Sequence, residues 1–237
     1  MQLPFEQFPA LSAIGICHHL FTQRIPGIDV STDKAKVLKR LEAAHREIRN
    51  AIGVGDWPLF TAQQVHGNKI AVVERAVASA ACPATAAVLS GLGGREFPGC
   101  DGIITNQRGI VLGVYVADCC AVHIVDPKTP AIGLVHSGRK GTELGVVTNA
   151  IRQMIDRFGS DPENMVVQLS PCIRPPHYEI DFAAEIVRQC RALGVKEIHD
   201  SGICTACDVS RYYSYRAEKG KTGRMLALVG LNPTDAN

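Results

Sequence analysis

Three neighbouring segments in the middle of the chain are apolar along almost their whole length, and they restrict the fold more than any other feature. They are IVLGVYVA (110–117), AVHIVD (121–126) and AIGLVHSG (131–138). A strand with one face in water alternates polar and apolar residues, whereas a strand covered on both faces reads as a continuous apolar run. The three segments therefore predict strands inside a covered sheet.

Amphipathic helices are predicted on either side of these strands. Apolar residues recur at helical spacing after a cap at Ser31 or Thr32 as far as Gly53, from Thr142 to about Phe158, and from about Phe182 to Leu193. Strands interleaved with such helices favour an α/β domain whose helices lie outside the sheet. The pattern leaves the strand order open.

Further elements complete the predicted map. A first strand is expected near residues 13–17, and LFTAQQV and KIAVVER (59–65 and 69–75) are typical of two strands joined by a short turn at His66. Residues 76–99, rich in Ala, Ser and Gly, predict a long surface excursion that could serve as a lid. Strands are expected at 165–169 and 225–231, with a short helix near 208–213.

Length and charge limit the class of protein. A chain of 237 residues, 46% of them hydrophobic, can build one sizeable core, so we expect a single domain over residues 1–237. The 25 Lys and Arg nearly balance the 23 Asp and Glu, which argues against a dedicated nucleic-acid or membrane binder. The N-terminus lacks a secretory pattern, so we expect a cytoplasmic protein whose nine cysteines are mostly free thiols.

Two residues with metal-binding side chains lie at the ends of the predicted central strands. Cys119 follows the first of them and His136 ends a later one, and the ends of neighbouring strands are where α/β folds place reacting groups. With His66 they make a zinc-compatible set of three ligands, which leaves a fourth position for water and would lower the pKa of that water towards ~7. Spacing alone leaves a plain structural role for each residue open.

The segment Gly138-Arg139-Lys140-Gly141-Thr142 adds a hint of anion binding. It places two cations at the start of a predicted helix, where unpaired backbone N–H groups favour an anion such as phosphate. A solvated basic turn with an ordinary helix cap explains the same residues equally well.

An ordered set of short motifs resembles a known family. The set comprises QVHG (64–67), CDGIIT (100–105), ADC (117–119), HSGRKGT (136–142), SPCI with YEI (170–180), CT (204–205) and YYSYR with TGR (212–224). It is similar to the YfiH-like, or laccase-domain, family, whose members are described as purine nucleoside phosphorylases. The resemblance implies an α/β fold with mixed sheets between helices. It also implies a zinc site on His66, Cys119 and His136.

The resemblance also implies an activity, in which phosphate displaces the purine of adenosine, inosine or guanosine. Adenosine deamination and methylthioadenosine phosphorolysis are further expected activities. Arg139, Lys140 and Thr142 are the expected phosphate ligands, and Arg216 could reach an anionic group. Asp118 is expected either to assist the departing base or, as we favour, to support the site from behind the ligands. The usual HAGWRG of the family is HSGRKG here, so Lys140 lacks the two-pronged geometry of the arginine it replaces.

Three other functions were weighed. A blue-copper oxidase needs a histidine-rich cluster, and a chain with 8 His and no His-X-His pair does not suit it. A metal-free cysteine hydrolase would use Cys119 as nucleophile and His136 or His66 as base. A scaffold would keep the zinc for stability alone.

Other cysteines and histidines are interpreted as structural. Cys204 and Cys207 have thioredoxin-like spacing, but without a partner motif they predict two buried or merely adjacent thiols. Cys120 is expected to point away from Cys119 into the core, and His123 to be a core histidine.

Overall fold

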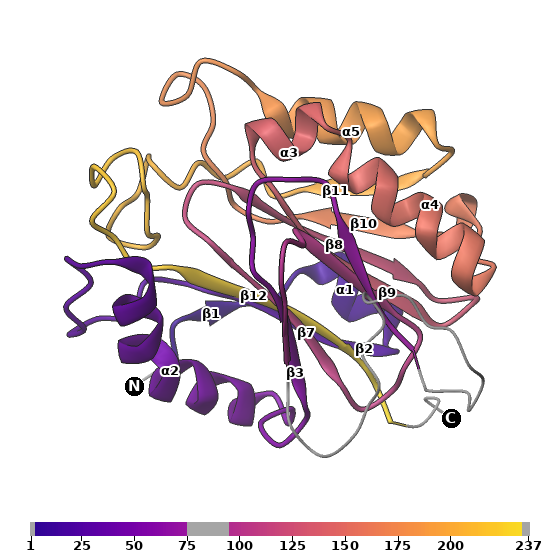
Figure 1. Cartoon of the computed structure of the whole chain (residues 1–237), viewed down its shortest axis with the longest axis horizontal. Helices are drawn as coiled ribbons and strands as arrows, with labels where there is room; N and C mark the ends of the chain where they lie inside the picture. The colour runs from indigo at the N-terminus through magenta and orange to yellow at the C-terminus, as the bar shows by residue number, and fades with distance from the viewer. Residues whose placement is uncertain (1–2, 75–94, 234–237) are drawn as a thin grey trace.

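The computed structural model describes residues 3–74 and 95–233 of the chain. Within them, two six-stranded sheets pack face to face and helices cover their outer faces, giving the layer order helix, sheet, sheet, helix (Figure 1). Both sheets mix parallel and antiparallel neighbours. The predicted α/β class is therefore confirmed.

The first sheet holds the N-terminal and C-terminal strands together. Its strand order is β1-β2-β12-β7-β3-β5. Strand β12 is antiparallel to both of its neighbours, whereas β3 is parallel to both of its own. The strands are β1 (Phe5–Glu6), β2 (Cys17–Thr22), β12 (Met225–Leu231), β7 (Val111–Val116), β3 (Leu59–Ala62) and β5 (Arg95–Phe97).

The second sheet has the order β11-β10-β8-β9-β6-β4. Its centre is the antiparallel pair β8 and β9, both buried along their whole length, as the apolar runs predicted. The strands are β11 (Glu197–Asp200), β10 (Val166–Leu169), β8 (Cys120–Asp126), β9 (Ala131–Ser137), β6 (Gly102–Thr105) and β4 (Ile70–Val73).

Three long helices cover the two outer faces, with α2 on one side and α4 and α5 on the other (Figure 1). Helix α2 (Lys34–Ala51) begins where the Asp33 side chain accepts a hydrogen bond from the backbone N of Lys36. Helices α4 (Val146–Phe158) and α5 (Phe182–Ala192) pack on the second sheet. The short helices are α1 (Pro9–Ile14), α3 (Arg139–Glu143) and the 3-10 turn η1 (Pro162–Asn164). None of the helices in the described ranges is long and apolar enough to cross a bilayer.

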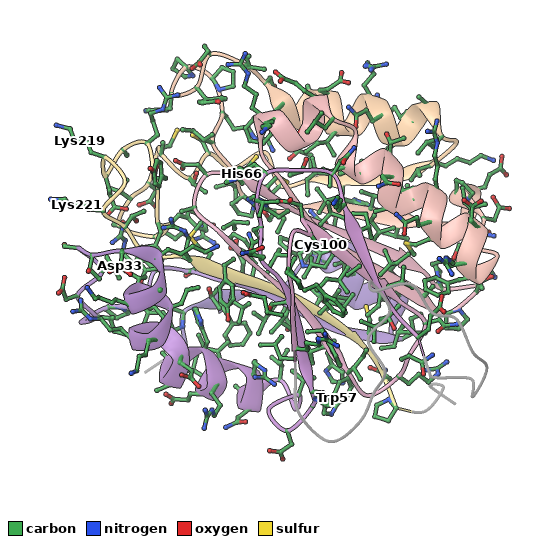
Figure 2. The ribbon with its side chains drawn as sticks, viewed as in Figure 1. Asp33, Trp57, His66, Cys100, Lys219 and Lys221 are labelled. Atoms are coloured by element: carbon green, nitrogen blue, oxygen red, sulfur yellow. The ribbon has the colours of Figure 1, made fainter. Side chains whose placement is uncertain are left out.

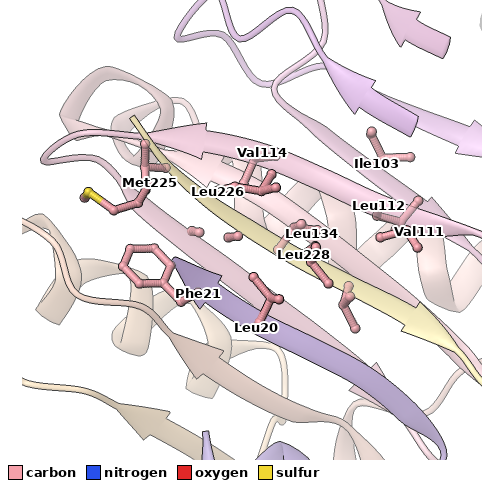
Figure 3. Packing of buried hydrophobic residues seen from close by; sticks show 14 of the residues in the cluster. Leu20, Phe21, Ile103, Val111, Leu112, Val114, Leu134, Met225, Leu226 and Leu228 are labelled. Carbon is pink, nitrogen blue, oxygen red and sulfur yellow. The ribbon is translucent and has the colours of Figure 1, made fainter. Parts of the chain in front are cut away.

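The main core lies between the two sheets and continues under α2. Leu112 and Leu228 of the first sheet and Leu134 of the second belong to this cluster and have no exposed surface (Figure 3). A second cluster joins the outer face of the second sheet to α4 and α5. Burial on both faces explains why the strands lack alternation.

Three connections cross from the first sheet to the second, and they cross near one another. They join β3 to β4, β5 to β6, and β7 to β8. In each case a strand of one sheet is followed by a strand of the other. The connections carry His66, Asp101 and Cys119, so the topology itself brings these residues towards one place.

Several predicted elements differ from the structure. The segment near residues 13–17 ends a helix, and the first long strand starts at Cys17. Strands β3 and β4 do not form a hairpin, because they lie in different sheets. The helix expected from Thr142 is divided by Gly145, which has a left-handed φ of 70°, and residues 208–213 form turns. Most of the expected excursion at 76–99 falls outside the described residues; its end is β5.

Candidate metal centre and active site

His66, Cys119 and His136 meet at the point where the chain crosses between the sheets. The nitrogen and sulfur atoms that they offer lie within 4.8 Å of one another, and Cys119 Sγ is 3.8 Å from His66 Nε2. His66 stands on the connection after β3 (Figure 2), and His136 lies near the end of β9. The predicted trio therefore converges in space.

Asp101, at the start of β6, fixes both histidines. Its carboxylate accepts hydrogen bonds from the backbone N of His66 and of Gly67, each at 2.7 Å, and from His136 Nδ1 at 3.0 Å. Because Asp101 holds the proton on Nδ1, the Nε2 lone pair of His136 is left for a metal. Asp101 is fully buried, and His66 is held with a left-handed φ of 61°. The ligand geometry is thus set by protein contacts alone.

Gly138 provides the space that the sulfur occupies. A Cβ at this position would lie 2.6 Å from Cys119 Sγ, closer than real Cβ contacts come. The backbone of residue 138 is extended (φ −94°), so the glycine is required by close approach rather than by conformation. The HSG sequence after β9 therefore places the histidine ligand and clears room for the thiolate.

The charges of the trio reinforce one another. Burial alone would raise the pKa of the Cys119 thiol, but His136, with a smaller contribution from His66, lowers it to about 6. Burial alone would lower the pKa of His136, but the Cys119 thiolate and the hydrogen bond to Asp101 raise it. Without a metal, the pair therefore favours a thiolate beside an imidazolium.

The three donors suit zinc. A tetrahedral ion with Zn–S near 2.3 Å and Zn–N near 2.05 Å places sulfur and nitrogen ligands about 3.6 Å apart. The 3.8 Å between Cys119 Sγ and His66 Nε2 agrees with this spacing. A group that could hold a metal ion is thus present, and its two imidazoles and one thiol all line the same pocket.

The pocket has a volume of about 520 Å³ and is lined by residues from both the N-terminal and the C-terminal half of the chain. It is lined by the start of α2, the β3–β4 and β7–β8 crossings, the end of β9 with the start of α3, the loop between β10 and α5, and the loop before β12. Tyr178 and Tyr215 face it together with Phe182 and Tyr115. Its size and its aromatic walls are those of a site for a small organic ligand.

Four cations line the same pocket, and they fall into two groups. Arg139 is paired with Glu143 at 2.9 Å, and Arg216 is 3.5 Å from Glu179. Lys34 and Arg224 form the second group: burial lowers the pKa of Lys34 and the charge of Arg224 lowers it further, against the opposing charges of Glu96 and Asp101. Their recorded side-chain hydrogen bonds go to backbone carbonyls.

Only one of the three phosphate ligands expected after His136 lines the pocket. Arg139 lines the pocket, but Lys140 is exposed and Thr142 is buried, and neither belongs to the lining. The Thr142 hydroxyl donates to the carbonyl of Gly138 at 2.9 Å and lies 2.8 Å from the Ser137 hydroxyl. Helix α3 has only five residues, too short for a strong helix dipole.

Asp118 lines the pocket and braces two loops. Its carboxylate accepts a hydrogen bond from the Thr205 hydroxyl and another from the backbone N of Arg216, both at 2.7 Å. A carboxylate with both oxygens accepting is suited to positioning rather than to proton donation. The residue that orients the ligand histidine is Asp101 instead, which the sequence interpretation did not single out.

Three other contributors were missed. They are Gly138, Lys34 and Arg224, and of these only Lys34 lies outside the family-like motifs. For Asp101 a signal existed, because CDGIIT was one of the family-like motifs and an acidic residue before a strand can orient a ligand histidine. Arg224 lies in the TGR motif, which could have suggested a function by the same reasoning.

The site stands in an α/β domain with a three-ligand His/Cys centre at its sheet crossings, and sequence comparison identifies the family. The family model described as multi-copper polyphenol oxidoreductase laccase matches residues 15–185 and 176–232. The chain belongs to this family.

Two bacterial purine nucleoside phosphorylases share low sequence identity with the chain. Purine nucleoside phosphorylase ORF3 of Streptomyces griseus is 27% identical over 92% of this chain and 96% of its own length. Purine nucleoside phosphorylase YlmD of Bacillus subtilis is 28% identical over 60% of this chain, and the match spans 63% of that protein.

Solved structures share the fold. The crystal structure of YlmD from Geobacillus stearothermophilus superposes with a TM-score of 0.77 at 21% identity, covering 98% of this chain and 100% of that one. The Bacillus licheniformis protein YfiH gives a TM-score of 0.74 over 91% of this chain and 93% of that one.

Proposed function

We propose that the chain is a zinc-dependent purine nucleoside phosphorylase that converts adenosine, inosine or guanosine and phosphate into the free base and ribose 1-phosphate. The observation that carries the proposal is the His66, Cys119 and His136 centre in a pocket of about 520 Å³ with aromatic and cationic walls. The relatives named purine nucleoside phosphorylase support the substrate class. Both substrates are small molecules, and we propose that they are met in the cytoplasm.

In the proposed reaction an oxygen of phosphate forms a bond to C1′ of the ribose while the bond from C1′ to the purine nitrogen breaks. Lys34 and Arg224 hold the phosphate, because both line the pocket and their side chains donate hydrogen bonds to backbone carbonyls rather than to carboxylates. Arg139 and Arg216 play a secondary part, since each already has a carboxylate partner. Two cations on one anion fix its orientation for attack.

Different residues of the pocket are proposed to contact the purine and to keep the surrounding loops in place. Tyr178 and Tyr215 offer flat faces on which a purine can stack. His66, Cys119 and His136 would hold zinc, which would supply a Lewis acid in the pocket. Asp118 keeps the loops of Thr205 and Arg216 in place around the substrate.

Adenosine deamination and methylthioadenosine phosphorolysis are proposed as further activities of the same pocket. Deamination needs attack of water at C6 of adenine beside a zinc ion, and a His/Cys centre with one open position allows it. Methylthioadenosine differs from adenosine only at the 5′ position, so the same base and phosphate contacts would serve.

The test is to incubate the zinc-loaded protein with adenosine, with and without phosphate, and to follow adenine and inosine by chromatography. Adenine that appears only with phosphate supports phosphorolysis, and inosine that appears without phosphate supports deamination. Cys119→Ala is the control for both activities. Full activity after complete removal of zinc would refute the zinc-dependent mechanism.

A second candidate function is a metal-free cysteine hydrolase. The observation in its favour is the chain Cys119–His136–Asp101, in which a thiol of lowered pKa lies beside a histidine that a buried carboxylate orients. Zinc decides between the two, because the hydrolase would use Cys119 as a free thiolate, whereas the phosphorylase would use it as a zinc ligand. Turnover by the metal-free protein that iodoacetamide abolishes would favour the hydrolase.

A further inference from the structure

A second cluster of metal-binding side chains lies on the loops beside the pocket. His177 Nδ1 is 3.4 Å from Cys207 Sγ and 3.8 Å from Cys204 Sγ, and the three donor atoms lie within 4.8 Å of one another. His177 belongs to the loop between β10 and α5, whereas the two cysteines follow β11. The proposed phosphorylase chemistry uses none of the three.

The spacing of the donors fits a tetrahedral ion. Zinc bonds of about 2.3 Å to sulfur and about 2.05 Å to nitrogen place a sulfur and a nitrogen ligand about 3.6 Å apart. The two sulfur–nitrogen distances lie on either side of this value. A Cys-X-X-Cys pair completed by a distant histidine is also a donor set that zinc prefers.

We propose that His177, Cys204 and Cys207 form a second zinc site, separate from the centre in the pocket. Cys204 is buried at 9% exposure, whereas His177 and Cys207 are exposed, so the ion is reached from solvent and its fourth ligand is water. The site differs from the first in carrying two thiolates rather than one.

The second zinc joins two loops that shape the pocket. Thr205, next to Cys204, donates a hydrogen bond from its hydroxyl to the Asp118 carboxylate at 2.7 Å. Tyr178, next to His177, lines the pocket. The guanidinium carbon of Arg216 lies over its ring, 4.9 Å from the ring centroid. A metal that fixes His177 to the cysteine pair therefore fixes both walls against each other. Its role is structural, with an effect on how the substrate is positioned.

A dithiol without metal is the opposing interpretation. Cys204 and Cys207 lie close enough to form a disulfide in an oxidising solution, and a Cys-X-X-Cys pair is a common redox motif. The histidine argues for the metal, because its Nδ1 is within 3.8 Å of both sulfurs and a disulfide has no use for such a ligand.

The test counts zinc per chain in the full-length protein, purified with a reductant that does not bind metals. We expect two zinc ions in the wild type, one in Cys207→Ser, one in His177→Ala and one in Cys119→Ala. His199→Ala is the control for His177→Ala, because His199 is half-exposed and its side chain pairs with Glu197 outside the cluster. Cys17→Ser is the matched control for the thiol. Both controls should keep two ions.

Cobalt gives a second measurement that does not depend on activity. Loaded with Co²⁺, the protein should absorb in the near ultraviolet through its thiolate ligands, and Cys207→Ser should lose more of this absorption than Cys119→Ala. Equal zinc content in the wild type, His177→Ala and Cys207→Ser under reducing conditions would overturn the proposal. Since His177 and Cys207 are exposed, circular dichroism should show all these variants folded.

Discussion

The molecule presents two clusters of histidine and cysteine that use similar atoms but rest on different supports. His66, Cys119 and His136 stand on the framework of the sheets, where buried Asp101 fixes both histidines through hydrogen bonds. His177 and Cys207 stand on exposed loops and have no such carboxylate among their recorded bonds. A centre whose ligands are oriented beforehand suits catalysis, whereas a loop centre suits bracing.

The difference predicts how each cluster responds to loss of its metal. The first should keep its geometry, because the sheet crossings and Asp101 define it without an ion. The second should loosen around His177 and Cys207, which are exposed, while backbone hydrogen bonds between Cys172 and the Cys204 segment and the Arg174–Asp200 ion pair keep the two loops together. The following experiments break or sharpen this contrast.

The largest effect should come from removing one thiolate from each cluster. Cys119→Ala should lower phosphorolysis to the limit of detection, because it removes a ligand of the reacting centre. Cys207→Ser should retain measurable turnover, because it removes a ligand remote from the reacting atoms. Steady-state rates with adenosine and phosphate measure both. Equal loss of activity in the two variants would refute the division into a catalytic and a bracing centre.

Gly138→Ala tests whether the first centre is rigid. The added methyl group would meet Cys119 Sγ at 2.6 Å, and a sheet crossing that cannot shift should expel the sulfur from its position. We expect loss of the zinc in the pocket with little change in the circular dichroism spectrum. Zinc content distinguishes the outcomes: two ions and unaltered turnover would mean that the framework yields.

The thiols of the two clusters should titrate differently in the metal-free protein. In the pocket, His136 opposes burial and lowers the pKa of Cys119 to about 6, so its thiolate should persist down to that pH. Hydrogen bonding with Cys204 raises the pKa of Cys207, so its thiolate should form only above the usual range. Mass spectrometry of iodoacetamide labelling at successive pH values measures both midpoints. Coincident midpoints would contradict the prediction, and added zinc should protect Cys119.

Asp101→Asn tests the carboxylate that orients the ligands. Loss of such a partner lowers metal affinity or activity by about 10- to 100-fold, and we expect this range for zinc in the pocket. Burial alone would raise the pKa of Asp101, but His136 and the backbone N–H groups lower it in the folded protein. The stability that it supplies is complete above about pH 3.9 and is lost as the pH falls through the folded value. Chemical denaturation at several pH values should show less acid dependence in the variant.

Much of the fold could be predicted from the sequence, because its central strands are buried on both faces. Continuous apolar runs identified β7, β8 and β9, and helical periodicity identified α2, α4 and α5. The pairing of strands could not be predicted from the sequence. The short connection between β3 and β4 is typical of a hairpin, yet the two strands lie in different sheets. The partner of each strand depends on contacts with residues far along the chain.

The candidate site followed the same division. The ligand types of His66, Cys119 and His136 were visible in the sequence, and the structure brings them together. Of the phosphate ligands expected after His136, only Arg139 lines the pocket, and the proposed ligands Lys34 and Arg224 reach it from opposite ends of the chain. Local motifs reveal chemistry, but cations gathered by the fold are revealed only by coordinates. His177 near the Cys204 and Cys207 pair is a further example.

The smallest effect should come from the hydrogen bond between Thr205 and Asp118, which are the sequence neighbours of Cys204 and Cys119. Thr205→Val keeps the shape of the side chain but removes the hydroxyl that holds Asp118. A hydrogen bond to a charged group contributes roughly 1.5–3 kcal/mol to stability, and only part of it should reach the transition state. We expect kcat/KM to fall about 3- to 10-fold with both zinc ions retained, while the matched control Ser210→Ala, whose hydroxyl bonds only Asp208, leaves it unchanged. Unaltered kinetics in Thr205→Val would mean that the loop centre and the sheet centre act independently, whereas loss of zinc would mean that Asp118 supports the metal itself.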